Sequence, residues 1–286
     1  MKVACLQFAP ELGKVEENMR RADAILSQTV LPARLDWLIL PEMAFSGYNF
    51  HSLSEITPYL EPTTSGPTTQ WAIRTALQHN CHVTVGYPET SSTPGKASTH
   101  YNSTVTVTPS GTVLLNYRKS FLYYTDETWA AEGTGFYAGN LGSLGKVSLG
   151  ICMDINPYRF ITPWDAYEFA SKALEAQTPV ICVSMAWLTT LSPEELAQEP
   201  LQADFTTLTY WVERFQPLVE KKALEPVYVI LANRCGMEKA ACYAGTTTVL
   251  KIEEGRVSVY DVLGKGEERC LVVDLNQTPK FRVRSD

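Results

Sequence analysis

Apolar residues along the chain follow two alternating patterns, one typical of strands and one typical of helices. Lys2–Phe8 alternates apolar and polar side chains, as a half-buried strand does. Glu16–Val30 places its apolar side chains at helical spacing. Leu35–Leu40 is a continuous apolar run, which is typical of a strand covered on both faces. These segments predict a strand, a helix and a second strand.

The same two patterns continue to the end of the chain. Helices are predicted over Gly66–His79, Pro163–Glu175 and Thr206–Leu224. Strands are predicted over His82–Gly86, Tyr101–Thr108, Thr112–Arg118, Lys146–Ile151, Val180–Ser184, Val227–Ala232, Ala244–Ile252, Arg256–Tyr260 and Arg269–Asp274. No repeat or long linker divides residues 1–286, so we expect a single α/β domain in which helices sandwich the sheets.

Composition and charge exclude several classes of protein. Of the 286 residues, 45% are hydrophobic and 19% are charged, which is ordinary for a globular chain. The formal net charge is −7, which argues against nucleic acid and against anionic membrane surfaces as partners. No run of apolar residues is long enough for a transmembrane helix.

Cysteine usage and the N-terminal sequence bear on the compartment. The chain has 7 cysteines without a CxxC pair, and the segment MKVACLQFAPELG resembles neither a signal peptide nor a transit peptide. We therefore expect a reduced, cytoplasmic protein, with the nucleus and mitochondria as the other compartments compatible with the sequence.

Several common catalytic motifs are absent from the sequence. It contains no HExxH, no P-loop, no GxGxxG after a strand and no GxSxG. None of the 4 histidines stands at metal-ligand spacing from a cysteine. The sequence therefore predicts no metal and no organic cofactor.

Three reactive side chains each follow the end of an apolar strand. They are Glu42 in LILPEMAFSGY, Lys119 in LLNYRKSFLYYTDE and Cys152 in VSLGICMDINPY. Each has an ordinary explanation: a partnered carboxylate, a solvated lysine and a small buried hydrophobe. Together they match the needs of amide hydrolysis, which are a nucleophile, a base and a cation near the developing oxyanion.

These motifs resemble the nitrilase, or carbon–nitrogen hydrolase, superfamily. PEMAFSGY, YRKSFLYYTDE and GICMDINPY stand in the order of its Glu–Lys–Cys triad, and Asn233–Thr247 is also similar to the family pattern. The resemblance implies a four-layer α-β-β-α sandwich. It implies that Glu42 is the general base, that Cys152 attacks, and that Lys119 and the Met153 backbone N–H hold the oxyanion. Glu127, eight residues beyond Lys119, matches the second glutamate of the family and would position substrate or modulate Glu42.

Within the superfamily, the sequence is most similar to fungal members that deamidate N-terminal Asn and Gln of proteins. Where other members carry Asp-x-Arg-Phe-Pro-Glu after the nucleophile, this chain has the stretch from Asp154 to Phe160. The resemblance implies release of ammonia through a Cys thioester, in the N-degron pathway, with protein or peptide N-termini as partners. It also implies a monomer or a homodimer.

A substrate with a free N-terminus carries an ammonium group, so the pocket should offer carboxylates and aromatic faces. Asp154 is the first candidate because it lies two residues from Cys152. Asp204 and Tyr48 are further candidates, and Trp187 is a candidate for the pocket wall.

Three alternatives remain open from the sequence. The first is the same chemistry on a small ω-amide, a carbamoyl compound or a nitrile. The second is a catalytically silent binding module on the same scaffold. The third is a hydrolase that pairs Cys152 with a histidine, although no histidine stands in a loop resembling a catalytic one.

Overall fold

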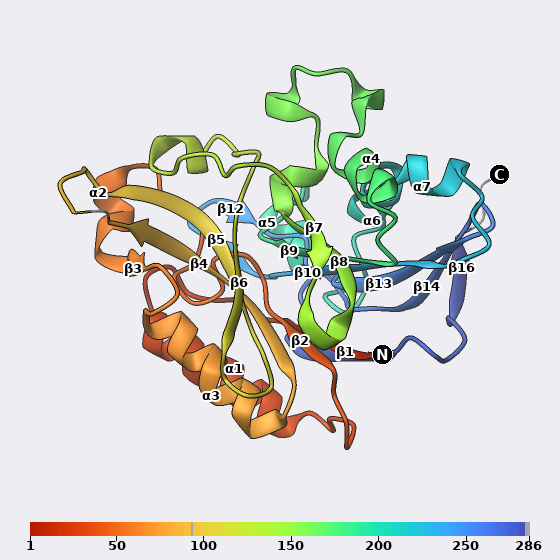
Figure 1. Cartoon of the computed structure of the whole chain (residues 1–286), viewed down its shortest axis with the longest axis horizontal. Coiled ribbons are helices and arrows are strands. Elements are labelled where there is room, and N and C mark those ends of the chain that lie inside the picture. The colour runs from red at the N-terminus through yellow and green to blue at the C-terminus, as the bar shows by residue number, and fades with distance from the viewer. Residues whose placement is uncertain (93, 284–286) are drawn as a thin grey trace.

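Two seven-stranded sheets pack together and are covered by helices on their outer faces (Figure 1). The computed structural model describes residues 1–92 and 94–283. The order of the first sheet is β15-β1-β2-β4-β5-β6, with β3 beside β4. Its strands are β1 (Lys2–Gln7), β2 (Trp37–Ile39), β3 (Glu61–Pro62), β4 (His82–Ser91), β5 (Thr99–Val107), β6 (Val113–Arg118) and β15 (Arg269–Asp274).

The second sheet has the order β16-β14-β13-β10-β9-β8-β7. Its strands are β7 (Tyr137–Asn140), β8 (Lys146–Ile151), β9 (Val180–Met185), β10 (Val227–Asn233), β13 (Thr248–Glu253), β14 (Arg256–Val262) and β16 (Phe281–Val283). A separate hairpin joins β11 (Met237–Glu238) to β12 (Ala241–Cys242). In each sheet three central strands run parallel, namely β1, β2 and β4 in the first and β8, β9 and β10 in the second.

Helices cover the outer face of each sheet. Helices α1 (Val15–Gln28) and α3 (Pro67–His79) pack on the first sheet through a cluster that includes Trp71 and Val83. The helices α4 (Glu168–Glu175), α6 (Phe205–Glu213) and α7 (Gln216–Glu220) pack on the second. Among the described residues, the other α-helices are the short α2 (Leu53–Ile56) and α5 (Pro193–Ala197), and several 3₁₀ turns lie in the loops. The predicted α-β-β-α sandwich is therefore confirmed.

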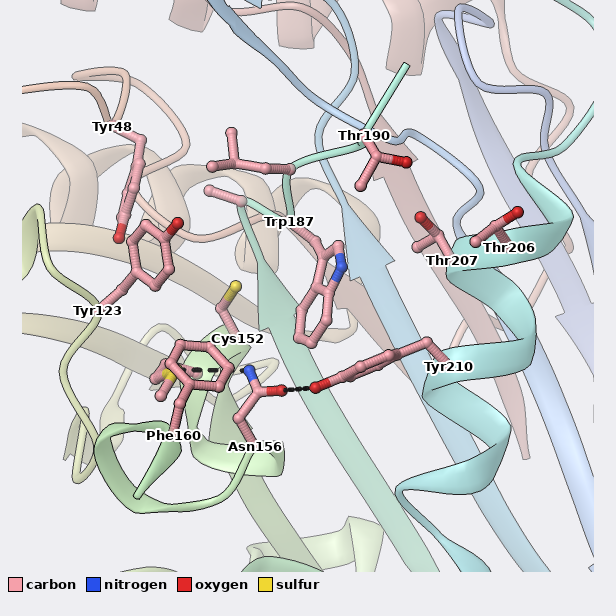
Figure 2. A pocket seen from close by; sticks show the side chains of 13 residues that line it. Tyr48, Tyr123, Cys152, Asn156, Phe160, Trp187, Thr190, Thr206, Thr207 and Tyr210 are labelled. Carbon is pink, nitrogen blue, oxygen red and sulfur yellow. Dashed lines mark hydrogen bonds between the residues drawn. The ribbon is translucent and has the colours of Figure 1, made fainter. Parts of the chain in front are cut away.

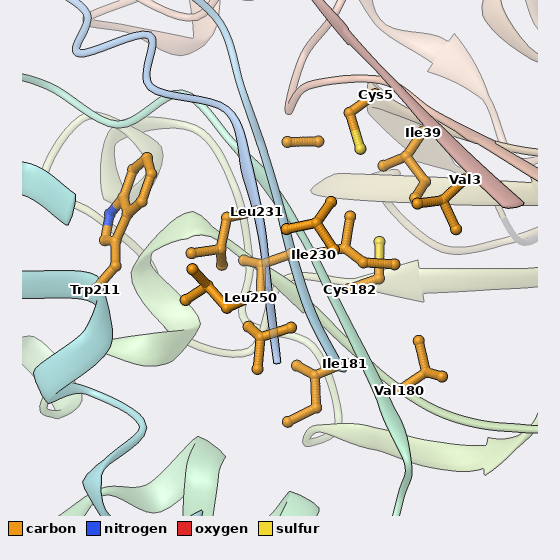
Figure 3. Packing of buried hydrophobic residues seen from close by; sticks show 14 of the residues in the cluster. Val3, Cys5, Ile39, Val180, Ile181, Cys182, Trp211, Ile230, Leu231 and Leu250 are labelled. Atoms are coloured by element: carbon orange, nitrogen blue, oxygen red, sulfur yellow. The ribbon is translucent and has the colours of Figure 1, made fainter. Parts of the chain in front are cut away.

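The space between the sheets is filled by apolar side chains from both of them (Figure 3). Val3, Cys5 and Ile39 of the first sheet belong to the same buried cluster as Cys182 and Ile230 of the second. The two sheets therefore share one core. Among the described residues, no helix has the length and apolarity needed to cross a membrane.

Two predicted helices are shorter than the hydrophobic pattern indicates. The helix expected over Thr206–Leu224 is divided into α6 and α7, and Pro217 lies in the first turn of α7. Proline favours that position and cannot continue a preceding helix. The helix expected from Pro163 begins only at Glu168, because Tyr167 before it has a left-handed φ of 43°.

Candidate active site

Glu42, Lys119 and Cys152 are brought together at strand ends of both sheets. Glu42 follows β2, Lys119 directly follows β6, and Cys152 directly follows β8 of the second sheet. Lys119 Nζ donates a hydrogen bond to Glu42 Oε1 at 2.6 Å, and both side chains are fully buried. Glu42 and Lys119 are 77 residues apart in the sequence, so it is the topology of the fold that brings them into contact.

Asp126, and not Glu127, is the second carboxylate of this cluster. Lys119 Nζ donates to Asp126 Oδ2 at 2.6 Å, and Asp126 is completely buried. The prediction for Glu127 is wrong, because its side chain is 37% exposed and forms an ion pair with Arg159 at 3.4 Å. The two carboxylates are neighbours in a tight helical turn over Asp126–Thr128, so they point in different directions.

The Glu42 carboxylate accepts hydrogen bonds from two donors besides Lys119. Asn102 Nδ2 bridges the two carboxylates, at 2.7 Å from Glu42 Oε1 and 3.0 Å from Asp126 Oδ1. The Ala186 backbone N–H donates to Glu42 Oε2 at 2.8 Å. Burial raises the pKa of Glu42 above its ordinary value, while the charge of Lys119 opposes the rise. A carboxylate held in this way is a stronger base than one in water.

The charge of Lys119 is fixed by the same two carboxylates. Burial alone would lower the pKa of Lys119, but Asp126 and Glu42 together raise it above its ordinary value. An ammonium group has three N–H donors, and two of them are used by these carboxylates. One N–H is left to hydrogen-bond an oxyanion.

Cys152 begins a short 3₁₀ helix (Cys152–Ile155) and has a left-handed φ of 42°. A non-glycine residue in this region is uncommon and marks a turn held by its surroundings. Burial raises the pKa of the Cys152 thiol well above its usual range, Glu42 adds to this, and Lys119 lowers it. Cys152 is therefore held as a thiol beside the Glu42 carboxylate. Met153, next in this helix, has a backbone N–H with no partner inside the helix.

Asp154 holds the turn that begins at Cys152, and its predicted contact with a substrate ammonium is wrong. Its carboxylate is fully buried and accepts hydrogen bonds from Tyr117 Oη at 2.7 Å and from the Ile151 N–H at 2.7 Å. The N–H groups of Ser120 and Phe121 donate to its other oxygen at 3.0 and 2.8 Å. Burial raises its pKa to about 6 against these hydrogen bonds. Asp154 therefore ties the Cys152 turn to the Lys119 loop.

A pocket of about 270 Å³ opens above Cys152 (Figure 2). The sulfur of Cys152 points toward the space between Tyr123, Phe160 and Trp187. Tyr48 and Trp187 line this pocket, as the sequence predicts. Beside Trp187, with 5.4 Å between the ring centres, Tyr210 Oη donates to Asn156 Oδ1 at 2.6 Å. No aspartate or glutamate is among the described residues that line the pocket.

Asp204 serves a different purpose from the one predicted. It is the N-cap of α6, where its Oδ1 accepts from the Thr207 N–H at 3.0 Å. Its other oxygen accepts from the hydroxyls of Thr189 and Thr207 at 2.7 and 2.8 Å. With these three donors, Asp204 stabilises the helix that carries Tyr210, and it does not line the pocket.

Several residues of the site have no recognisable signal in the sequence. Asn102 lies on β5, and Tyr123, Phe160 and Tyr210 come from three further segments. Asp126 stands in the same TDE stretch as Glu127, which makes both carboxylates candidates but does not indicate which of them faces Lys119. Within residues 1–92 and 94–283, no cluster of histidine, cysteine and carboxylate side chains is arranged to hold a metal ion.

Known proteins similar to this chain include two that are named protein N-terminal amidase. The sequence profile of the carbon–nitrogen hydrolase family matches residues 2–161. The protein N-terminal amidase of Schizosaccharomyces pombe is 37% identical over 292 residues, with 97% of this chain and 100% of that protein covered. The protein N-terminal amidase of Saccharomyces cerevisiae is 32% identical over 213 residues, which cover 67% of this chain and 46% of that protein.

Solved structures share the fold at lower sequence identity. A crystal structure of N-terminal amidase has a TM-score of 0.84 at 22% identity, with 96% of this chain and 97% of that chain covered. Another, with an Asn-Glu peptide, has a TM-score of 0.83 at 22% identity and covers 95% and 96%. Together with the family profile and the full-length relative, these similarities establish that the chain belongs to the carbon–nitrogen hydrolase family, the nitrilase superfamily.

Proposed function

We propose that this protein is an amidohydrolase that converts N-terminal Asn and Gln of proteins and peptides to Asp and Glu. One observation carries the proposal: a full-length relative named protein N-terminal amidase is 37% identical to this chain. The site agrees with it, because Cys152 lines a pocket and the Glu42–Lys119 pair is buried.

The geometry supports a two-step reaction. Cys152 Sγ attacks the side-chain carboxamide carbon while Glu42 takes the thiol proton. The remaining N–H of Lys119 and the backbone N–H of Met153 stabilise the oxyanion. Glu42 then gives the proton to the departing nitrogen, and ammonia leaves behind a thioester. Glu42 deprotonates a water molecule, which attacks the thioester carbon and releases the carboxylate product and the Cys152 thiol.

The pocket supports recognition of a substrate ammonium by aromatic rings. Its wall contains the rings of Tyr48, Tyr123, Phe160 and Trp187 and no carboxylate from the described residues. Aromatic faces attract a desolvated ammonium through the ring quadrupole. Asn156 Oδ1, which accepts one hydrogen bond from Tyr210, has a second lone pair for an N–H of the substrate.

The cellular setting is part of the same proposal. N-terminal Asp and Glu produced in this way would act in the N-degron pathway, and a cytoplasmic location fits substrates made there. Seven free cysteines agree with reducing surroundings.

Peptides that differ only at the N-terminus test the proposal. Wild-type protein is incubated with an Asn-peptide, a Gln-peptide, an acetyl-Asn-peptide and free glutamine, and ammonia release is measured. Mass spectrometry follows the replacement of NH₂ by OH. We expect rapid turnover of the first two only. Faster turnover of free glutamine would favour a small-amide hydrolase, and equal turnover of the acetylated peptide would contradict recognition of the ammonium.

A further inference from the structure

A buried ion pair lies behind the active-site pocket, in the Asn233–Thr247 stretch. Arg234 is 0% exposed and Glu238, on β11, is 3% exposed. Arg234 donates to the Glu238 carboxylate and, through Nη2, to the Pro10 carbonyl at 2.9 Å. Tyr243 Oη donates to Glu238 Oε2 at 2.7 Å. Neither charged residue lines the pocket, so their part in the reaction must be indirect.

The Glu238 carboxylate holds the loop that carries Tyr48. Its Oε2 accepts from the backbone N–H of Tyr48 at 3.1 Å and from that of Asn49 at 2.9 Å. Gly47 has a φ of +78°, and a Cβ there would come within 2.5 Å of Glu238 Oε1. The backbone of the loop over residues 47–49 therefore lies in close contact with the Glu238 carboxylate, and Arg234 fixes the position of that carboxylate.

Tyr48 extends from this loop to the catalytic cluster. Its hydroxyl donates to Asp126 Oδ2 at 3.1 Å, on the oxygen that also accepts from Lys119 at 2.6 Å. Lys119 Nζ lies 5.5 Å from the centre of the Tyr48 ring. Burial raises the pKa of Tyr48 well above its usual range, so the phenol stays protonated and remains a donor.

We propose that Glu238 is a positioning residue, which acts on the Glu42–Lys119–Cys152 centre by holding the Tyr48 hydroxyl against Asp126. The inference rests on the proposed function for its peptide assay. Glu238 is 190 residues from Tyr48 in the sequence, so the contact between them cannot be recognised from spacing. If Tyr48 is displaced, Asp126 loses a hydrogen-bond donor. The Asp126 carboxylate is then held less firmly and orients Lys119 less well.

A double-mutant cycle tests this inference. Glu238→Gln keeps the shape of the side chain. Its amide NH₂ group would, however, face N–H or O–H groups that now donate hydrogen bonds to the carboxylate. Glu238→Gln and Tyr48→Phe should each lower kcat for an Asn-peptide about tenfold, as the loss of one hydrogen bond allows. In the Tyr48→Phe background, Glu238→Gln should lower kcat by no more than about twofold. Equal losses in both backgrounds, or wild-type kcat for Glu238→Gln, would overturn the inference.

A milder variant covers the case in which Glu238→Gln does not fold. Tyr243→Phe removes one donor to Glu238 and leaves the ion pair with Arg234 in place. It should lower kcat about threefold, and that loss should disappear in the Tyr48→Phe background. Persistence of the full loss without the Tyr48 hydroxyl would contradict the proposed connection.

A matched control separates positioning from general stability. Glu61 is also a buried carboxylate that accepts a backbone N–H, that of Thr68 in the first turn of α3 at 2.8 Å, but it lines no part of the pocket. Glu61→Gln should lower the Tm, leave kcat within about twofold and show no coupling to Tyr48→Phe. Coupling as strong as that of Glu238→Gln would show that the cycle reports only stability.

A second readout needs no peptide. Alkylation of Cys152 by iodoacetamide, measured across the same cycle, reports on the thiol and its neighbours. Glu238→Gln and Tyr48→Phe should change this rate in the same direction and without additivity. If wild type does not hydrolyse Asn-peptides, the proposed function fails while this cycle still decides the role of Glu238. Additive changes in the alkylation rate would reject that role.

Discussion

Asp126 Oδ2 lies 2.6 Å from Lys119 Nζ, at the same distance as Glu42 Oε1. One buried ammonium thus stands between two buried carboxylates. The arrangement carries one net negative charge when both carboxylates are ionised. Because Asp126 raises the pKa of Glu42 by its charge, the second carboxylate makes Glu42 a stronger base. Asp126 therefore has two consequences, an oriented lysine and a more basic Glu42.

Asp126→Asn should change both the rate and its pH dependence. Activity requires ionised Glu42, so kcat/KM should rise with pH through the pKa of that group. Loss of the Asp126 charge lowers that pKa, and the acid limb should move to lower pH. The rate at the optimum should fall about tenfold or more, because Lys119 loses a charged partner.

The neighbouring residue supplies the control for this variant. Glu127→Gln removes the charge of the residue next to Asp126. The Glu127 side chain is 37% exposed and lies outside the cluster. Its pH profile should match that of wild type, and kcat should stay within about twofold. A shift of the acid limb in Glu127→Gln, with none in Asp126→Asn, would restore the role first predicted for Glu127.

The sequence was sufficient to single out Glu42, Lys119 and Cys152 as neighbours but not the residues around them. Glu42, Lys119 and Cys152 each follow a recognisable apolar strand, and their motifs stand in family order. Asp126 was missed because the direction of a side chain in a tight turn depends on tertiary contacts, which spacing does not encode. Asp154 was misassigned for a related reason: its donors, such as Tyr117 Oη, come from another sheet.

The pocket wall was the least predictable part of the site. Tyr123, Phe160, Trp187 and Tyr210 come from loops and a helix that are far apart in the sequence. Aromatic residues in such segments are usually packed in the core, so composition alone does not distinguish a wall from a core. The fold was more predictable, because strand and helix periods are local. Its errors include the helix ends at Pro217 and Tyr167 and the short edge strands β7 and β16, which the pattern did not predict.

Cys152→Ser should abolish turnover and leave the fold intact. A serine hydroxyl is far less acidic than a thiol, so Glu42 cannot readily deprotonate it. Ammonia release is measured together with the circular dichroism spectrum. The control is Cys5→Ala, which removes a buried sulfur within β1 and should lower the Tm while kcat is unchanged. A rate within threefold of wild type for Cys152→Ser would exclude Cys152 as the nucleophile.

Lys119→Met should cost both stability and activity. It leaves Glu42 and Asp126 buried together without a cation, a change that typically destabilises a protein by about 3–5 kcal/mol. Loss of the oxyanion donor should lower kcat by about 10²–10³. Urea unfolding and ammonia release measure the two effects separately.

A compensated variant separates these two effects of Lys119. The double variant Lys119→Met with Asp126→Asn removes one buried negative charge together with the cation. It should recover part of the free energy of unfolding but none of the activity. Recovery of activity with stability would mean that Lys119 only holds the fold.

Asp154→Asn tests the corrected role of that residue. The carboxylate of Asp154 accepts four hydrogen bonds, and the NH₂ group of an asparagine could not accept all of them. The protein should therefore lose about 1–3 kcal/mol of stability. Because Asp154 does not line the pocket, the ratio of kcat/KM for free and acetylated Asn-peptides should equal that of wild type. A collapse of this ratio would return Asp154 to the substrate.

Phe160 offers a test of how the pocket binds an ammonium group. It lies in the pocket wall, is 45% exposed and contacts Tyr123 at 6.4 Å between ring centres, so its replacement should not unfold the protein. Phe160→Leu removes a π face but stays apolar, whereas Phe160→Tyr keeps the face. A partly desolvated cation–π contact is worth about 1–2 kcal/mol, so Phe160→Leu should raise KM for the Asn-peptide about fivefold to thirtyfold.

Phe160→Tyr should leave KM within about twofold, and the weak turnover of acetyl-Asn-peptide should be the same in all three proteins, because that peptide has no ammonium to bind. An equal rise in KM for both peptides in Phe160→Leu would show that Phe160 acts by shape alone. In that case the ammonium would have to be bound by oxygen atoms such as Asn156 Oδ1.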